Sequence, residues 1–351
     1  MKATLLHSFW LILCLATVRG ETNIIGESAD FKNGTYTEFA VRPDSEGKHI
    51  AAHHGGVIFV DGKYWWYGQT FQEKSTREGG ATTKIGLVIY SSPDLLAWKY
   101  EGVILSCQPS GDLEGPLRFE RPKIIYDEKT RKFVMWCHYV GRPGDHGVRA
   151  GTADAGIANC DTINGNYQWH GYYRPLGPDM TVKDCTLFKD EDGAAYFIFD
   201  SYPTNRSKVR CLHIARLSDD YLKAVEVRRI PGTESREAPA MIKRNGYYFL
   251  ITSGTSGWEP NAAKCHRAAN IWGPYQDLSN FCVGEQRDIA FNAQATYVFE
   301  LHDAPGCYVF MGDRWCQPNM KRSAHIWLPL EFPTGDTVRM RYFKQWNRRS
   351  Y

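Results

Sequence analysis

The sequence predicts an all-β protein, a five-bladed β-propeller folded as one domain. Three observations lead to this fold class. A hairpin pattern recurs five times, tight-turn residues separate its strands, and aromatic residues make up 14% of the 351 positions. A single blade cannot bury both of its faces, so neighbouring blades must pack large side chains between them. Regular repeats therefore favour one closed ring over two or three domains or an irregular β-sandwich.

Each repeat consists of an apolar strand, a turn and an aromatic-rich strand. The first hairpin pairs residues 56–60 with 63–68 across an Asp-Gly turn. The other four span residues 122–136, 186–199, 239–251 and 295–311. Asp-Gly and Asn-Gly accept the positive φ of tight hairpin turns and are strong signals for them. Weaker segments at 99–105, 224–227 and 266–275 predict outer strands, so we expect four strands in each of five blades.

The first twenty residues are typical of a secretory signal peptide. Lys2 precedes a mostly apolar stretch at 5–18, and the small residue Gly20 precedes Glu21. A membrane anchor is the weaker interpretation, because a spanning helix needs about 20 apolar residues and no later segment approaches that. We therefore expect a leader at 1–20, one propeller at 21–351 and a secreted protein. Asn33 and Asn205 begin glycosylation sequons that fit this route.

Charge and cysteine content narrow the partners and the compartment. The formal net charge is only +3, from 42 basic and 39 acidic residues, so we expect no nucleic-acid partner and, after leader cleavage, no membrane partner. An uncharged polar partner suits this balance better. Of ten cysteines, Cys14 lies in the leader, and the remaining nine show no zinc-knuckle spacing. We expect a few disulfides, with Cys265 and Cys282 as the favoured pair, although sequence does not determine connectivity.

One polar residue per repeat should converge at one end of the propeller axis, because a closed ring gathers the starts of its inner strands there. These residues are His53 (with His54), Glu120, Asp184, Glu237 and Gln294. Buried like charges repel and shift each other's pKa, so three carboxylates in one pocket indicate a function. Hydrolysis of a glycosidic bond needs such a set, a protonated carboxylic acid and a second group that activates water. In the structural alternative, each carboxylate only pairs with an adjacent arginine.

Other chemistries lack their motifs. The sequence contains no Gly-x-Ser-x-Gly elbow, phosphate loop or His-Glu-x-x-His pattern. His53, His54 and the carboxylates could hold a cation, but no ligand spacing supports this, so we predict neither metal nor cofactor. Trp65, Trp66, Trp258 and Trp315 stand near the same strand ends and could stack on sugars, although such residues are more often core. Trp258 is the strongest candidate because it lies in a Gly- and Ser-rich loop.

Several motifs, in order along the chain, resemble glycoside hydrolase family 43, and within it the exo-β-1,3-galactanases. The motifs are Glu-Arg-Pro-Lys at 120–123, the segment 183–193, Arg-Glu-Ala-Pro-Ala at 236–240, Thr-Ser-Gly-Trp-Glu-Pro-Asn at 255–261 and Met-Gly-Asp-Arg-Trp at 311–315. The resemblance extends from about His53 to Trp346 and implies the same five-bladed propeller.

The resemblance also implies roles in an inverting mechanism. Glu237 matches the general acid, and Asp184 the carboxylate that tunes and orients it. Most of the family has an aspartate base on the first blade, but residues 52–56 contain none. In the galactanases a glutamine matching Gln294 acts on the water, in one view as its imidic acid tautomer, and a glutamate matching Glu120 holds the sugar. Because an amide is a poor base, Gln294 could instead position the water while Glu120 activates it.

The candidate substrate-binding residues are Gln69, Trp258, Asp313, His53 and Trp315. Gln69 stands where the galactanases usually have a sugar-binding glutamate, which would alter hydroxyl recognition. The sequence thus predicts a secreted, monomeric, cofactor-free exo-glycosidase that acts on β-1,3-galactan, such as the arabinogalactan backbone. The alternatives are another family 43 specificity, arabinofuranosidase or xylosidase, and a sugar-binding propeller without catalysis.

Overall fold

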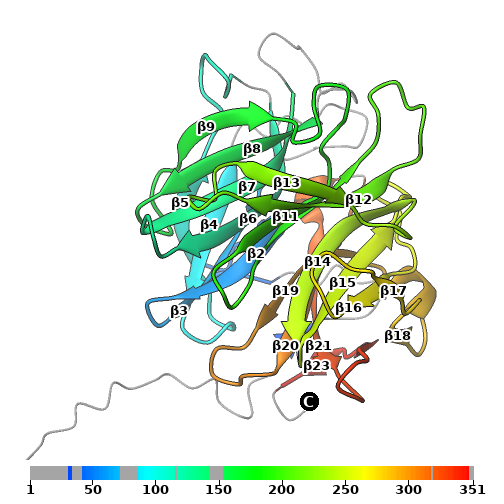
Figure 1. Cartoon of the computed structure of the whole chain (residues 1–351). Helices are drawn as coiled ribbons and strands as arrows, with labels where there is room; N and C mark the ends of the chain where they lie inside the picture. Colours follow the sequence, from blue (N-terminus) through cyan, green and yellow to red (C-terminus); the bar gives the residue numbers. More distant parts are fainter. Residues whose placement is uncertain are drawn as a thin grey trace, which may run out of the picture.

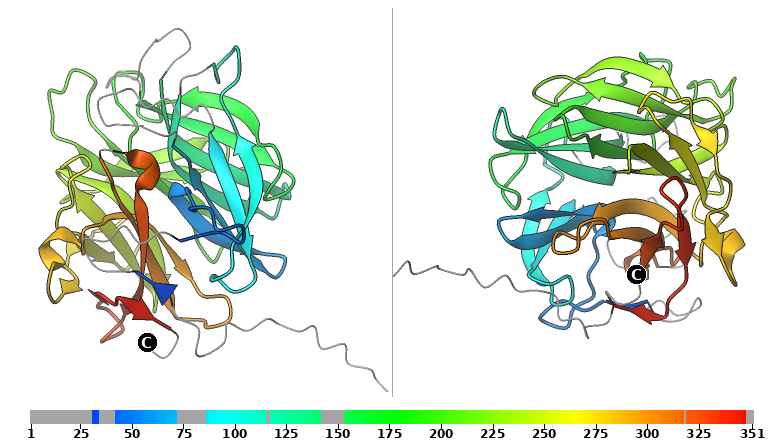
Figure 2. Two further views of the ribbon diagram at one scale, coloured as in Figure 1. Left: turned by 180° about the vertical axis from the view of Figure 1, so that it is seen from behind. Right: turned by 60° about the horizontal axis from the view of Figure 1, so that its bottom comes forward.

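A computed structural model describes residues 31–33, 42–71, 86–114, 117–141, 153–317 and 319–347, so the predicted leader lies outside the described residues. In these ranges the chain forms strands and two short 3₁₀ turns, η1 (Arg287–Ile289) and η2 (Met320–Arg322). The strands form five main sheets around a common axis (Figures 1 and 2). The predicted all-β class and five-bladed propeller are confirmed.

The first four blades are antiparallel sheets of four strands in chain order. Blade 1 contains β2 (His53–Val60), β3 (Lys63–Gln69), β4 (Leu87–Ser92) and β5 (Lys99–Leu105). Blade 2 contains β6 (Arg118–Asp127), β7 (Lys132–Val140), β8 (Ala153–Cys160) and β9 (Gln168–Tyr173). Blade 3 contains β10 (Cys185–Lys189), β11 (Ala195–Ser201), β12 (Cys211–Leu217) and β13 (Ala224–Arg229). Blade 4 contains β14 (Arg236–Arg244), β15 (Tyr247–Gly254), β16 (Lys264–Ala268) and β17 (Gln276–Asp277).

Blade 5 departs from the expected four strands. It contains β19 (Gln294–Glu300), β20 (Tyr308–Arg314), β21 (Ala324–Glu331), β22 (Arg339–Arg341) and β18 (Cys282–Val283). The chain leaves blade 4 after β17, and the short β18 then pairs in parallel with β22 as an added strand of blade 5. A separate two-stranded sheet joins β1 (Phe31–Lys32) to β23 (Gln345–Trp346).

The aromatic residues fill the spaces between blades. Trp66, Trp98 and Trp327 are buried in one cluster, and the ring centroids of Trp66 and Trp327 lie 4.9 Å apart across blades 1 and 5. Trp136 of blade 2 packs on Phe197 of blade 3 with centroids 4.7 Å apart. Trp65 and Trp66 thus belong to the core rather than to a ligand surface.

Asn33 ties the start of the described chain to its end. Its Nδ2 donates to the carbonyls of Trp327 at 2.7 Å and Phe343 at 3.0 Å, and its Oδ1 accepts the Trp327 N–H at 2.9 Å. Because this amide is fully buried, the sequon at Asn33 is not available for modification in the folded protein. Asn205, which begins the second sequon, is exposed.

No disulfide links the cysteines of the described ranges, so the predicted Cys265–Cys282 pair is wrong. The backbone of Cys265 in β16 exchanges hydrogen bonds with Leu278 and Ser279. Three residues later the chain has turned away, and Cys282 pairs with Met340 of blade 5. Both thiols are buried in the hydrophobic core between these strands.

β-Bulges interrupt the innermost strands near the axis. The register shifts between Glu120 and Lys123 and between Glu237 and Ala240, with similar shifts in β2 and β19. Arg121 has φ 54° and Ala238 φ 52°, left-handed conformations that L-residues adopt at a cost of about 1–2 kcal/mol. A bulge re-aims the neighbouring side chains, here toward the axis.

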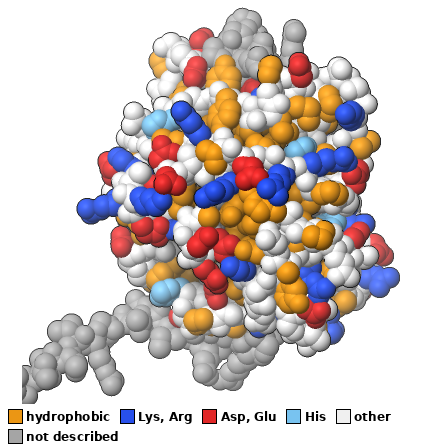
Figure 3. Space-filling model, in the orientation of Figure 1, with side chains coloured by type: hydrophobic (Ala, Val, Ile, Leu, Met, Phe, Trp, Pro, Cys, Tyr) orange, Lys and Arg blue, Asp and Glu red, His pale blue; other side chains and the backbone are white. Residues whose placement is uncertain are grey.

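The described surface carries both signs of charge. Figure 3 shows lysine and arginine side chains interspersed with aspartate and glutamate on one face, without a large patch of either sign. Within the described residues, no helix has the length and apolar character needed to cross a bilayer.

Candidate active site

The inner strands converge on a pocket at one end of the axis. The cavity has a volume of about 420 Å³, and Glu120, Asp184, Glu237 and Gln294 all line it, together with His54 and Trp258. A cavity of about 460 Å³ lies at the hairpin-turn end of the same strands, but none of the four axis residues lines that one. The chemically equipped pocket is therefore the one at the strand starts.

Each axis residue has a cross-strand partner on the second strand of its blade. The pairs are His53 with Gln69, Glu120 with His138, Asp184 with Asp200, Glu237 with Ser253 and Gln294 with Asp313. Partners in antiparallel strands lie side by side, so five hairpins bring ten side chains to one end of the ring. The sequence interpretation missed His138, Asp200 and Ser253, although the hairpin register implies them.

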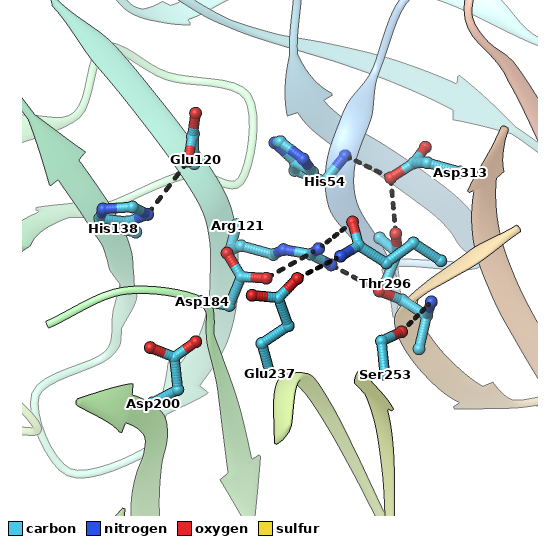
Figure 4. A network of polar contacts seen from close by, with 12 residues as sticks. His54, Glu120, Arg121, His138, Asp184, Asp200, Glu237, Ser253, Thr296 and Asp313 are labelled. Atoms are coloured by element: carbon cyan, nitrogen blue, oxygen red, sulfur yellow. Dashed lines mark hydrogen bonds and ion pairs between the residues drawn. The ribbon is translucent and has the colours of Figure 1, made fainter. Parts of the chain in front are cut away.

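Glu120 is held by two nitrogen donors. Arg118 Nη1 lies 2.9 Å from Glu120 Oε1, and His138 Nδ1 lies 3.1 Å from Oε2 (Figure 4). Burial alone would raise the pKa of Glu120, but Arg118 and His138 hold it well below its usual range. Burial lowers the pKa of His138, so its imidazole is neutral near pH 7. Glu120 is thus an ionised carboxylate in the pocket wall, the state required of a base.

Arg121 connects Asp184 to Gln294 (Figure 4). Its Nη2 lies 3.1 Å from Asp184 Oδ2 and 2.7 Å from Gln294 Oε1, and its Nη1 donates to the Ala295 carbonyl. The guanidinium is almost completely buried. Burial opposes ionisation of Asp184, but Arg121 lowers the pKa of this carboxyl below its ordinary value.

The orientation of the Gln294 amide follows from the chemistry of its neighbours. Arg121 Nη2 and, at 3.0 Å, Trp315 Nε1 both face Gln294 Oε1, and guanidinium and indole groups only donate. The atom between them must be the oxygen, so Nε2 points to Glu237 and donates to its Oε1 at 3.1 Å. The imidic tautomer would place a proton on the oxygen that already receives two donors. This arrangement suits a positioning amide better than a base.

Glu237 shares Arg210 with Asp200. Arg210 Nη1 contacts Glu237 Oε2 and lies 3.4 Å from Asp200 Oδ2. In Figure 4 the Asp200 side chain lies below Asp184 and to the left of Glu237. Desolvation raises the pKa of Asp200 to about 7, despite Arg210. Burial opposes the charge of Arg210, but Asp200 and Asp184 raise its pKa. No sequence pattern singled out Arg210, which lies in the segment before β12.

The five candidate substrate-binding residues occupy different positions. Trp258 lines the pocket, and its ring centroid lies 4.8 Å from that of Trp315. Gln69 is buried behind the lining, 3.3 Å from His54 Nδ1. His53 and Asp313 are buried away from the pocket as well, and His54 lines it instead. Burial, with Arg121, lowers the pKa of His54 to about 4, so this imidazole is neutral near pH 7.

Asp313 supports the pocket from behind. Its Oδ2 accepts the His54 N–H at 2.9 Å and the Thr296 hydroxyl at 2.5 Å (Figure 4). Its Oδ1 lies 3.5 Å from His53 Nδ1 and 3.6 Å from His325 Nε2. Burial opposes ionisation, but the hydrogen bond from His53 and the nearby His325 lower the pKa of Asp313. A buried carboxylate thereby fixes the backbone of a pocket residue.

Three groups of side chains bring metal-ligating atoms within 4.8 Å of one another: His53, Asp313 and His325; Glu120, His138 and Asp184; and Asp184, Asp200 and Glu237. In the first, the imidazoles are stacked at 4.5 Å and only 9° from parallel. Imidazole lone pairs lie in the ring plane, so two stacked rings cannot both aim at one ion. In the other two groups, Arg118, Arg121 and Arg210 already supply positive charge. None of the three arrangements fits a metal well.

Known proteins are similar to this chain in sequence and fold. The sequence profile of glycosyl hydrolases family 43 matches residues 52–303. A family 43 β-1,3-galactosidase solved with galactodeoxynojirimycin is 33% identical with a TM-score of 0.79, over 88% of this chain and 99% of that one. An exo-β-1,3-galactanase from Clostridium thermocellum is 30% identical with a TM-score of 0.76, over 90% of this chain and 66% of that one.

Similarity to curated proteins covers shorter stretches. Xylosidase/arabinosidase 43B of Humicola insolens is 33% identical over 201 residues, which make up 54% of this chain and 35% of that protein. A β-xylosidase of Bacillus subtilis is 29% identical over 126 residues, 34% of this chain and 23% of that protein. This chain therefore spans only about a quarter to a third of these relatives' lengths. The profile match and the carboxylate-lined pocket of a five-bladed propeller lead to one conclusion: the chain belongs to glycosyl hydrolases family 43.

Proposed function

We propose that this glycoside hydrolase is a secreted exo-β-1,3-galactanase that inverts the anomeric configuration. The observation that carries the proposal is the oriented Gln294 amide between Arg121, Trp315 and Glu237, in a chain whose first blade has no carboxylate at residues 52–56. The galactanases combine a glutamine here with the missing aspartate. The names of the two solved structures support the same specificity.

In this proposal Glu237 is the general acid. It lines the pocket and would donate its proton to the glycosidic oxygen as the bond to the anomeric carbon breaks. Asp184 and Glu237 bring one oxygen each within 4.8 Å of one another, and nearby negative charge favours the protonated form of an acid. Asp184, held ionised by Arg121, supplies such a charge.

We assign water activation to Glu120 and water positioning to Gln294. Glu120 has the depressed pKa of an ionised carboxylate and can accept the proton of an attacking water. The Gln294 oxygen is occupied by two donors, but its amide nitrogen has a second N–H that can orient the water. The water would attack the face of the sugar opposite the leaving group, which inverts the anomeric carbon.

The pocket wall suits a neutral sugar at a chain end. Trp258 and the neutral His54 stack with centroids 5.8 Å apart, and their faces and edges can pack on a pyranose ring. A pocket at one end of the propeller axis suits the removal of terminal units from a β-1,3-galactan. The predicted leader, the sequon at Asn205 and the near-neutral charge support an extracellular polysaccharide substrate. We expect the enzyme to act as a monomer without a cofactor.

Analysis of product configuration tests the proposal. The enzyme is incubated with a β-1,3-galactooligosaccharide, and proton NMR identifies the first anomer released. We expect α-galactose from wild-type enzyme and nearly no turnover from Glu237→Gln, with ligand binding retained. A first β product would refute inversion, and an active Glu237→Gln variant would refute its role as acid. Binding without turnover by the wild type would favour a sugar-binding propeller.

A second specificity has a specific observation in its favour. The Humicola insolens relative is a xylosidase/arabinosidase and is 33% identical over its aligned segment. We therefore propose β-xyloside and α-arabinofuranoside cleavage as the runner-up activity. A comparison of kcat/KM on aryl β-galactoside, β-xyloside and α-arabinofuranoside decides between them, because faster cleavage of a pentoside would overturn the galactanase assignment.

A further inference from the structure

Asp200 is a buried carboxyl group to which the proposed mechanism gives no role. Its side chain is 0% exposed, it does not line the pocket, and Oδ1 has no hydrogen-bond partner among the described residues. An unsatisfied buried carboxylate oxygen is costly, which argues against a purely structural purpose. Its position explains what it could do, because it lies next to the proposed acid.

The titratable groups around Asp200 come from three segments. Arg210 from the segment before β12 lies 3.4 Å away. Asp184 and Lys183 precede β10, and Glu237 comes from β14. The Cys211 thiol follows Arg210 and is also influenced by Asp200. Asp184 is already paired with Arg121, so Arg210 is the cation shared by Asp200 and Glu237.

This arrangement poses a problem for a general acid. Arg210 contacts Glu237 directly, and an adjacent guanidinium favours the ionised carboxylate, which cannot donate a proton. A second carboxyl group on the same guanidinium removes the difficulty. Two carboxyl groups that share one cation cannot both ionise easily, so the pair retains one proton over a wider pH range.

We propose that Asp200 is a positioning residue for the acid: it competes with Glu237 for Arg210 and shares one proton with it, so that Glu237 is protonated when substrate binds. The inference rests on the proposed role of Glu237. In each turnover Glu237 transfers its proton to the leaving oxygen as the glycosidic bond breaks, and Glu120 takes a proton from the attacking water. Solvent then returns a proton to the Asp200–Glu237 pair and removes the one on Glu120. The high pKa of Asp200 is in keeping with this sharing.

Two substitutions should move the pH profile in opposite directions. Asp200→Asn leaves Arg210 to Glu237 alone, so the alkaline limb of kcat/KM should move to lower pH by about one unit or more, with KM at low pH nearly unchanged. Arg210→Met removes the cation from the acid, and the limb should move to higher pH. Asp190→Asn is the matched control, because Asp190 is a partly buried carboxylate of the same blade that pairs with Lys243 at the other end. It should not move the limb.

A uniform fall in kcat at all pH values, with the limb unmoved in Asp200→Asn, would overturn the proposal, since a merely structural residue acts in that way. A second readout needs no substrate. Infrared difference spectra of the wild type near neutral pH should contain a protonated carboxyl band that is absent in both Asp200→Asn and Glu237→Gln. If the band is absent in both variants and the wild type does not cleave galactan, the proposed function is refuted but the shared proton is supported. If galactan is cleaved and the band persists in Asp200→Asn, the shared proton is refuted.

Discussion

The substitution Gln294→Glu tests the orientation of the axial amide with a change of one atom. The amide nitrogen lies 3.1 Å from Glu237 Oε1 and is replaced by an oxygen. The other oxygen keeps both of its donors, Arg121 at 2.7 Å and Trp315 at 3.0 Å. A hydrogen bond to the acid thereby becomes a contact between two carboxyl oxygens, which is favourable only when one of them carries a proton.

The size of the effect follows from these distances. Two unit charges 3.1 Å apart repel by about 5 kcal/mol at an effective dielectric constant of about 20. Arg121 attracts the introduced carboxylate by a similar amount, so the proton resides on Glu237. Carboxyl pairs at such separations raise one pKa by about 1–3 units after relaxation. Glu237 should therefore stay protonated to higher pH, and the alkaline limb of kcat/KM should rise by about 1–3 pH units.

The assay is kcat/KM on β-1,3-galactobiose as a function of pH for wild type and variant. Gln317→Glu is the matched control, because Gln317 Nε2 also donates to a glutamate, Glu259, but on the exposed surface. We expect the control to retain the wild-type profile. An alkaline limb that stays in place, or moves to lower pH, in Gln294→Glu would refute either the amide orientation or the role of Glu237 as acid.

Three further predictions address the base, the acid stability and the sequons. Glu120→Gln should lower kcat by about 10²–10⁴-fold with little change in KM, the usual contribution of a positioned base. A larger fall in kcat in Gln294→Ala than in Glu120→Gln would reverse the roles assigned to the two residues. Burial lowers the pKa of His54, His213 and His266 to about 4. Between about pH 6.5 and 4 the unfolded chain therefore binds more protons than the native one, so the melting temperature should fall as the pH drops through this range. A melting temperature that does not change with pH would contradict neutral buried imidazoles. Mass spectrometry of protein from a eukaryotic secretory host should find glycan on Asn205 and none on Asn33, whereas a native protein with modified Asn33 would contradict its burial.

Local patterns account for the parts of the fold that sequence predicts well. Three of the five hairpins contain an Asp-Gly or Asn-Gly turn, which determines both strands within a few residues, and the other two follow the same pattern of an apolar strand, a turn and an aromatic-rich strand. The pairs β1–β23 and β18–β22 could not be predicted in this way, because strands of two or three residues carry no periodicity and form only when distant segments meet. The Cys265–Cys282 error has the same origin, since a turn between them sends Cys282 to another blade.

The site was predictable to the extent that it repeats once per blade. Glu120, Asp184, Glu237 and Gln294 all reach the pocket because each occupies the same place in its hairpin. His53 does not, because it stays fully buried while its neighbour His54 (φ 61°) lines the pocket. A shift of one residue reverses the face of a strand, and sequence spacing does not reveal it. Arg210 belongs to a segment without any repeat, so only the assembled ring shows that it reaches Glu237.

The hydrogen bonds of Asn33 to Trp327 and Phe343 also have a consequence for the order of events during synthesis. Its partners Trp327 and Phe343 lie 294 and 310 residues further along the chain. During synthesis the Asn33 side chain therefore stays exposed until the ribosome has released these last strands. An enzyme that recognises the sequon would meet Asn33 in this interval, and a sugar attached then would leave no room for the two carbonyls. A nascent chain modified at Asn33 would thus lose the hydrogen bonds that join the start of the described chain to Trp327 and Phe343. If the chain enters the secretory route, folding of its last strands would compete in time with glycosylation of Asn33.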